Sequence, residues 1–260
     1  MINLVTVMEL SLKMVLIACP MVFLAGFVDA IGGGGGLISL PGYLFAGLPA
    51  HAAVATNKLS SAIGTSFSCY KYFKNGYADL KLAVPGIIMA LIGAQVGAHF
   101  ALIVSDEIFR TILLIALPVI AIYTFFKKDL NPDLTKIPPR HIQYILVALI
   151  SLTVGAYDGF YGPGAGTFFI LLYTSIVKMD VLTASGNTKL VNLASNISAL
   201  CAFIIGGEVY FKLGLITSIF SIAGHLCGSS LAIKKGSKLV RYIILAVIIL
   251  LSTKMIIEMI

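Results

Sequence analysis

Two lysines within apolar stretches are the side chains best suited to chemistry in this sequence. Lys58 lies in AVATNKLSSAIG, and Lys189 lies in ASGNTKLVNLAS. A lysine inside a membrane helix costs at least about 2.5 kcal/mol, so it normally faces a cavity or a partner. Helical positions i, i+3 and i+7 share a face, so each lysine heads a polar stripe. The two stripes with their neighbouring asparagines are Asn57, Lys58, Ser61 and Thr65, and Asn187, Lys189, Asn192 and Asn196.

These stripes predict a cavity that binds a small oxyanion, with the lysines supplying positive charge. An alternative is that both lysines lie near helix starts and extend their ammonium groups to the membrane surface. In that case the stripes would be structural.

A glycine-rich run precedes each lysine. The runs are GGGGG at 32–36 and GPGAG at 162–166. Glycine weakens a helix, so each run predicts a break whose freed backbone groups a bound ion could satisfy. Helices that begin at Leu37 and Thr167 would direct N–H donors and a positive dipole end at an anion. The expected backbone contacts are Gly33, Gly34, Gly35, Gly162 and Gly164. The alternative is close helix packing through small residues.

An aspartate precedes each run, Asp29 in the first case and Asp158 in the second. Either could balance a lysine, cap backbone groups at the break, or carry a proton for coupling, and the first two roles are favoured. His99 and His225 do not match one another in the repeat described below, and they are interpreted as structural. Because no catalytic arrangement or metal-ligand spacing is present, the sequence predicts no enzyme, no catalytic residue, no metal and no cofactor.

The composition places these residues in a membrane. Of the 260 residues 59% are hydrophobic and 11% are charged, whereas soluble domains carry about a quarter charged residues. Unbroken apolar runs indicate an all-α polytopic membrane protein rather than a β-barrel. The net charge is +7, and most of the lysines and arginines lie between the apolar segments. This placement predicts basic cytoplasmic loops rather than a nucleic-acid-binding surface. The four cysteines lie in apolar segments without a C-x-x-C pair, so disulfides are not expected.

Eight segments are long enough to cross about 30 Å of hydrocarbon, which takes about 20 helical residues. The expected spans are 10–30, 51–73, 82–104, 107–126, 141–157, 181–206, 212–233 and 239–257. The segments 37–48 and 167–177 are too short to cross at about 1.5 Å per residue.

The chain contains an internal duplication with a spacing of 131 residues. The matched pairs are Lys58 and Lys189, Gly76 and Gly207, Lys81 and Lys212, Gly93 and Gly224, Gly97 and Gly228, and Arg110 and Arg241. Equivalent loops carry opposite charge bias, as SDEIFR at 105–110 and GSKLVR at 236–241 illustrate. Under the positive-inside rule the halves therefore face opposite ways, with both termini outside. We expect two inverted repeats of five segments, 1–126 and 142–260, joined by a charged, proline-rich cytoplasmic linker at 127–141.

The stretches VDAIGGGGGLISLPGYLFAGLPAHAAVATNKL and GFYGPGAGTFFILL…SGNTKLVNLASNISAL resemble the TauE/SafE (sulfite exporter) family of membrane proteins. The resemblance covers nearly the whole chain. It implies a secondary carrier of small sulfur-containing anions, such as sulfite, sulfonates or sulfoacetate, in the bacterial inner membrane. Its N-(T)-K-L motifs imply anion contacts at Asn57, Lys58, Asn187 and Lys189.

The sequence as a whole predicts a secondary transporter of a small sulfur oxyanion or organosulfonate. The anion would bind between the two repeats, which would rock to give alternating access. Coupling to a proton through Asp29 or Asp158 is a further hypothesis. The expected partners are the anion and the lipid bilayer, and the apolar outer faces could also pack into a homo-oligomer. A passive anion channel is the main alternative, and a membrane-embedded enzyme is a weaker one.

Overall fold

The computed structural model describes residues 9–105, 137–240, 242–243 and 246, and all elements within these residues are helical. The bounded helices are α2 (Leu12–Gly32), α3 (Gly36–Phe45), α4 (Ala50–Lys74), α5 (Leu80–Ile103), α7 (Arg140–Phe160), α8 (Ala165–Ser175), α9 (Val181–Ile205) and α10 (Phe211–Lys235). The expected spans 107–126 and 239–257 and the linker 127–141 lie wholly or mostly outside the described residues.

Helix starts carry the polar caps that their sequences supply. The side chains of Ser11, Asp79 and Asp180 accept backbone N–H groups in the first turns of α2, α5 and α9. Capping of this kind satisfies donors that have no partner within the helix. Pro49 and Pro139 directly precede α4 and α7. Local chemistry therefore helps to set where these five helices start.

Among the described residues, α2, α5, α7, α9 and α10 are long and apolar enough to cross a membrane. Helix α4 is as long as α9, at 25 residues, but its polar stripe makes it less apolar. Helices α3 and α8 contain 10 and 11 residues, so each covers only about 15–17 Å. The expected all-α membrane architecture and the two expected short segments are confirmed within the described residues. The expected span 51–73 forms α4 but is not among the five helices that are apolar enough to cross.

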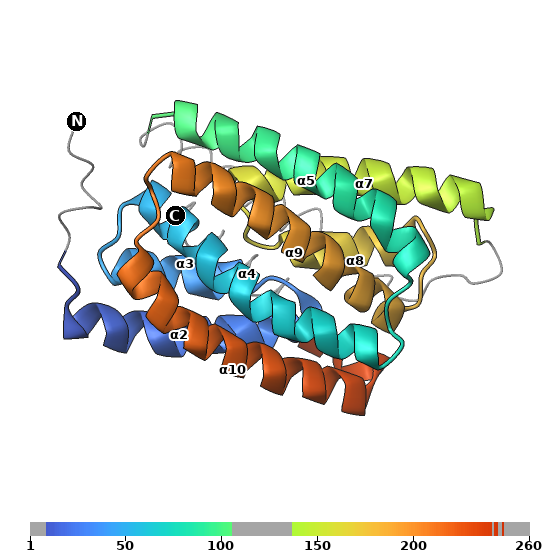
Figure 1. Cartoon of the computed structure of the whole chain (residues 1–260). Helices are drawn as coiled ribbons and strands as arrows, with labels where there is room; N and C mark the ends of the chain where they lie inside the picture. The colour runs from blue at the N-terminus through green and yellow to red at the C-terminus, as the bar shows by residue number, and fades with distance from the viewer. Residues whose placement is uncertain (1–8, 106–136, 241, 244–245, 247–260) are drawn as a thin grey trace, which may run out of the picture.

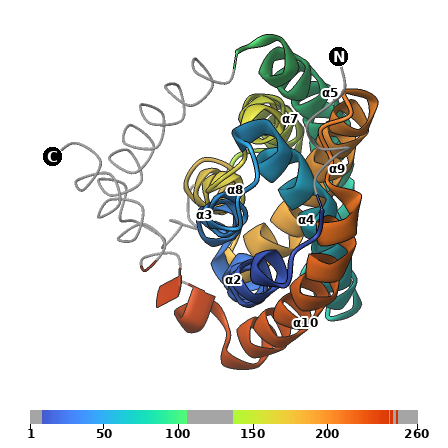
Figure 2. The same cartoon turned by 90° about the vertical axis from the view of Figure 1, so that its left-hand side faces the viewer.

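The long helices form a bundle in which two pairs pack most extensively, α5 with α7 and α10 with α2. Helices α4 and α9 contact one another in the interior, and they also pack on α10 and α5 respectively. Figure 1 shows α2, α4 and α10 running in one direction along the bundle and α5, α7 and α9 running in the other. In the end-on view of Figure 2, the short helices α3 and α8 lie beside α2, α4 and α7.

Glycines allow the two most extensive helix pairs to approach closely. A Cβ atom on Gly97 of α5 would lie 1.9 Å from the carbonyl oxygen of Ala156 in α7. A Cβ atom on Gly228 of α10 would lie 2.3 Å from the carbonyl oxygen of Phe27 in α2. Packing through small residues is typical of membrane helices, where lipid provides no hydrophobic driving force between them.

Candidate functional site

Both glycine runs interrupt helices within the bundle. Gly33 and Gly34 separate α2 from α3 and have φ of +76° and +82°. Gly162 and Gly164 separate α7 from α8 and have φ of +100° and +84°. Residues that carry a side chain rarely adopt this left-handed backbone conformation, so the glycines are needed for both breaks.

The two breaks touch one another within the bundle. A Cβ atom on Gly33 would lie 2.3 Å from the backbone nitrogen of Thr167, and one on Gly36 would lie 3.0 Å from Cα of Pro163. The hydroxyl of Thr167 donates to the carbonyl of Gly32 over 3.0 Å. The two halves therefore meet through their interrupted backbones.

The buried lysines and aspartates form two ion pairs that cross between the halves. Lys58 Nζ lies 2.9 Å from Asp158 Oδ1, and Lys189 Nζ lies 3.0 Å from Asp29 Oδ2. The side chains are 1% and 4% exposed in the first pair and 0% and 14% exposed in the second. Each lysine therefore neutralises the aspartate that precedes the glycine run of the other half, as buried charges require a partner.

The aspartates also bind groups other than lysines. Asp29 Oδ1 accepts the backbone N–H of Gly35 over 3.3 Å, within its own break. Asp158 Oδ2 accepts the hydroxyl of Ser195 over 2.5 Å, from α9. The ammonium of Lys189 donates to the backbone carbonyl of Asp29 as well. The charged groups are thus held by both side-chain and backbone contacts.

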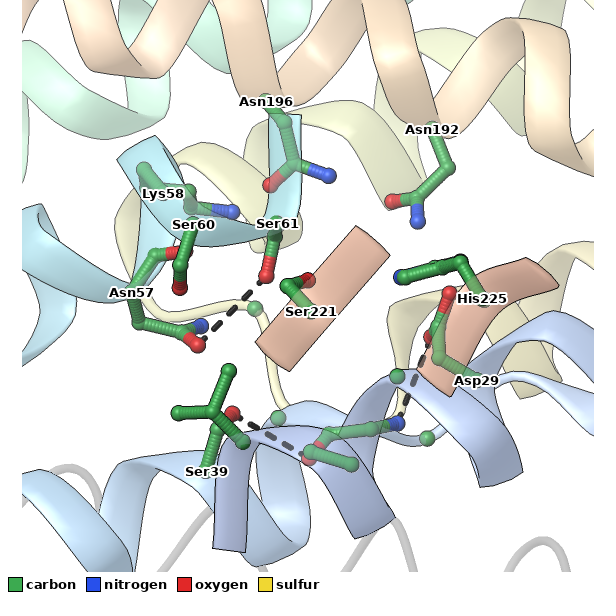
Figure 3. Close-up of a pocket in the computed structure, with 18 of the residues that line it drawn as sticks. Asp29, Ser39, Asn57, Lys58, Ser60, Ser61, Asn192, Asn196, Ser221 and His225 are labelled. Carbon is green, nitrogen blue, oxygen red and sulfur yellow. Dashed lines mark hydrogen bonds between the residues drawn. The ribbon is translucent and has the colours of Figure 1, made fainter. Parts of the chain in front are cut away.

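A polar cavity adjoins the breaks and the ion pairs, with about 470 Å³ of empty space that includes some open to solvent. In Figure 3, Asn192 and Asn196 project from α9 toward the first glycine break, and Asn57 lies on α4 to one side. The sequence-predicted residues that line the cavity are Asp29, Gly34, Gly35, Asn57, Lys58, Ser61, Asp158, Gly162, Gly164, Asn192 and Asn196. Most of the expected site residues therefore come together around one space.

Four expected site residues lie outside the cavity lining. Gly33 packs against the second break, and the ammonium of Lys189 is directed to Asp29. Thr65 is buried, and its hydroxyl has no hydrogen-bond partner in the described part of the chain. Asn187 contacts a loop instead, since its Oδ1 accepts the backbone N–H of Asp79 over 3.1 Å.

The contact of Asn187 has an equivalent in the other half. Asn187 corresponds to Thr56 at the 131-residue spacing, and the hydroxyl oxygen of Thr56 accepts the backbone N–H of Tyr210 over 3.0 Å. Asp79 and Tyr210 are the residues that directly precede α5 and α10. We call these two contacts the loop clamps. They fasten the start of α9 to the start of α5, and the start of α4 to the start of α10.

Several lining residues were not predicted from the sequence: Ser39, Ser60, Ser221 and His225. His225 was expected to be structural, but it lines the cavity, and its Nδ1 lies 3.1 Å from the hydroxyl oxygen of Ser68. Ser221 and His225 are four residues apart on α10, so they share one helix face. The spacing of these polar residues along α10 was the available signal.

The clamp at Asp79 includes a charged contact at the end of the bundle. Arg140, the first residue of α7, forms an ion pair with the Asp79 carboxylate. Partial desolvation opposes ionisation of Asp79, but the hydrogen bond and charge of Arg140, together with backbone N–H groups at the start of α5, outweigh it and lower the pKa of that carboxyl. The pair therefore joins the starts of α5 and α7 in its charged form.

Long apolar helices, two short helices at glycine breaks and a polar cavity between them define a multi-pass α-helical membrane protein. The chain belongs to the family described as Sulfite exporter TauE/SafE, whose sequence profile matches residues 18–255. The expected family is therefore confirmed.

Relatives match over most of their own length. The chain is 35% identical to the "Probable membrane transporter protein ORF9" of Sinorhizobium sp, over 90% of this chain and 88% of the relative. It is 33% identical to the "Probable membrane transporter protein YfcA" of Escherichia coli strain K12, over 89% of this chain and 86% of the relative. A "Probable membrane transporter protein" of Haemophilus influenzae is 30% identical, over 96% of this chain and 97% of the relative. No solved structure matches the chain.

Proposed function

We propose that the protein is a secondary transporter of a small sulfur oxyanion or organosulfonate in the bacterial inner membrane. The observation that carries the proposal is the polar cavity beside the two glycine breaks, which touch one another. Residues from both halves of the apolar bundle line this cavity. The family description and the names of the relatives support transport, and the family description also supports a sulfur anion.

The anion would bind chiefly through hydrogen-bond donors. The carboxamides of Asn57, Asn192 and Asn196 lie around the cavity, next to the backbone of both breaks. The Ser61 hydroxyl, also at the cavity, donates to Asn57 Oδ1 over 3.4 Å and so orients that carboxamide. Lys58 is the lysine that lines this space, and Asp158 already balances its charge. Donors fixed by the fold can stabilise an anion without a free cation, as at helix N-termini and backbone nests.

The balanced charges favour coupling of the anion to a proton. Two lysines and two aspartates form the crossed pairs, so their formal charges sum to zero. An anion added alone would bring uncompensated negative charge into a medium of low dielectric constant, which is costly. A proton bound at Asp29 or Asp158 would remove this cost.

Alternating access would come from two inverted repeats that rock against one another. The proposed repeats are residues 1–126 and 142–260. Matched helices run in opposite directions along the bundle, as α4 and α9 do in Figure 1. The α5–α7 and α10–α2 contacts exchange under the 131-residue spacing, and so do the two loop clamps. The two ion pairs exchange as well, with their lysines 131 residues apart and their aspartates 129 residues apart. Inverted repeats with broken helices at the midplane are a common design of secondary transporters.

Ligand-dependent thermal stability of the purified protein tests the binding site. We expect sulfite, thiosulfate or sulfoacetate to stabilise the protein, by about 2.7 kcal/mol at a concentration of 100 times the Kd. Asn192→Ala removes one donor, and a hydrogen bond to a charged group contributes about 1.5–3 kcal/mol, so affinity should fall about tenfold or more. Asn75→Ala is the matched control, because Asn75 is exposed at the end of α4. Equal affinity in both variants would contradict the site.

Transport in proteoliposomes distinguishes a carrier from a passive channel. A carrier gives saturable uptake and counterflow of labelled ligand, because one site faces the two sides in turn. Ohmic currents without counterflow would contradict the carrier and support a channel instead.

A further inference from the structure

The two crossed ion pairs differ in how firmly their carboxylates are held. Asp158 receives Lys58 on one oxygen and the hydroxyl of Ser195 on the other, at 2.9 and 2.5 Å. A Cβ atom on Gly162 would lie 2.9 Å from both Asp158 Oδ1 and Lys58 Nζ, so backbone packs against this pair. A proton on Oδ2 of Asp158 would have to displace the hydrogen that Ser195 donates. This carboxylate is therefore poorly placed to exchange a proton.

Asp29 is the more accessible of the two carboxylates. Its side chain is 14% exposed and borders the cavity, against 4% for Asp158. Its Oδ1 accepts the backbone N–H of Gly35 at the longer distance of 3.3 Å, whereas Oδ2 faces Lys189. Oδ1 can therefore accept a proton while the contacts of Lys189 to Oδ2 and to the Asp29 carbonyl remain.

The difference between the pairs arises where the two halves depart from their symmetry. At the 131-residue spacing, Ser195 corresponds to Gly64 and His225 corresponds to Ala94. A Cβ atom on Gly64 would lie 2.6 Å from Cδ2 of His225, so this glycine makes room for the imidazole. The Asp29–Lys189 pair thus gains a neighbouring histidine and the Asp158–Lys58 pair gains a hydroxyl donor, and both residues come from the second half of the chain.

His225 lies next to Asp29 at the cavity wall. Figure 3 shows the Asp29 carboxylate beside the imidazole, with a ring nitrogen of His225 directed toward the space between Ser221 and Asn192. Three side chains face this pair. Lys189 comes from α9, and Tyr72 and Ser68 come from α4. The hydroxyl of Tyr72 donates to the carbonyl of Ala30, so it is engaged elsewhere.

We propose that Asp29 and His225 form the proton-exchange site of the transporter, and that Asp158 with Ser195 is a permanent counter-ion for Lys58. This inference rests on the proposed function and deepens it. A proton from cavity water binds Asp29 Oδ1 or the imidazole, and it returns to water when the cavity faces the other side. With Asp29 neutral, Lys189 leaves one net positive charge beside the cavity. Proton and anion therefore each strengthen binding of the other, as linkage requires.

Proteoliposomes loaded with radiolabelled thiosulfate test the assignment. Thiosulfate keeps its charge across the pH range in which histidine titrates, so any pH effect belongs to the protein. Two quantities are measured for each variant: accumulation driven by a pH gradient, and counterflow without a gradient. Their ratio reports proton coupling separately from binding and folding. The variants are Asp29→Asn and His225→Gln, and the matched control is Ser195→Ala, because Ser195 contacts Asp158 but lies outside the cavity lining.

We expect the ratio to fall about fivefold or more in Asp29→Asn and His225→Gln, which is the lower range of typical coupling between two sites. Ser195→Ala should keep the wild-type ratio even where its counterflow is slower. His225→Gln removes no member of an ion pair, so it remains informative where Asp29→Asn does not fold. A ratio that stays unchanged in His225→Gln, or one that falls as far in Ser195→Ala as in His225→Gln, would overturn the assignment.

Two outcomes separate this inference from the proposed function. Saturable wild-type counterflow with no response to a pH gradient would overturn the proton-exchange site but leave the transporter in place. Wild-type vesicles without counterflow of thiosulfate, sulfite or sulfoacetate would contradict the proposed function itself.

Discussion

Lys58 and Asp158 belong to different halves of the chain, yet they form a buried ion pair 2.9 Å apart. The sequence predicted that Lys58 and Lys189 face a polar interior, because a lysine in an apolar helix requires a partner. It also offered a salt bridge as one role of the aspartates. It could not predict which aspartate pairs with which lysine. Helical periodicity determines the face of a residue, but the partner depends on how α4 and α9 cross the opposite break.

Removal of one member of the pair should destabilise the protein strongly. Lys58→Met leaves the carboxylate of Asp158 buried without its cation, which costs about 3–5 kcal/mol. The double variant Lys58→Met with Asp158→Leu should recover most of this loss, because no charge then stays unpaired. Unfolding in detergent measures both, with Lys234→Met at the exposed end of α10 as the control. Equal losses in the single and double variants would show that the charge itself is unimportant for stability.

At the scale of elements, composition and glycine placement predicted the short helices well. Residues 37–48 and 167–177 were expected as short segments, and α3 and α8 occupy Gly36–Phe45 and Ala165–Ser175. Leucine and alanine patterns could not reveal that the two breaks touch, because this contact joins residues far apart in the chain. His225 was missed for a related reason. Its place at the cavity wall depends on packing opposite Gly64, and the 131-residue repeat contains no matching histidine.

The glycine contacts between long helices should tolerate no added side-chain atoms. In Gly97→Ala the new Cβ would lie 1.9 Å from the Ala156 carbonyl oxygen, so α5 and α7 must separate. Overpacking of this kind costs about 1–3 kcal/mol. Gly228→Ala should show a similar loss at the equivalent α10–α2 contact. Thermal unfolding measures the effect, and Val96→Ala on the exposed face of α5 serves as the control. Full stability of Gly97→Ala would mean that these helices pack less closely than described.

At the scale of the whole molecule, the loop clamps lie at opposite ends of the bundle. The clamp of Asn187 joins the starts of α9 and α5, at the right-hand end of Figure 1. The clamp of Thr56 joins the starts of α4 and α10, at the left-hand end. In an inverted-repeat transporter the two ends open in turn, so equivalent clamps should hold opposite faces closed.

Weakening one clamp should therefore bias the cavity toward the side that the clamp closes. A hydrogen bond contributes about 0.5–1.5 kcal/mol, so Asn187→Ala and Thr56→Ala should each shift accessibility about two- to tenfold, in opposite directions. Ser61→Cys, at the cavity wall, reports accessibility through its reaction with an impermeant maleimide in vesicles of either orientation. The four native cysteines are first replaced by alanine. Thr153→Ala is the control, because the Thr153 hydroxyl bonds within its own helix. Shifts toward the same side in both clamp variants would contradict an inverted arrangement, since equivalent contacts would then act on one face.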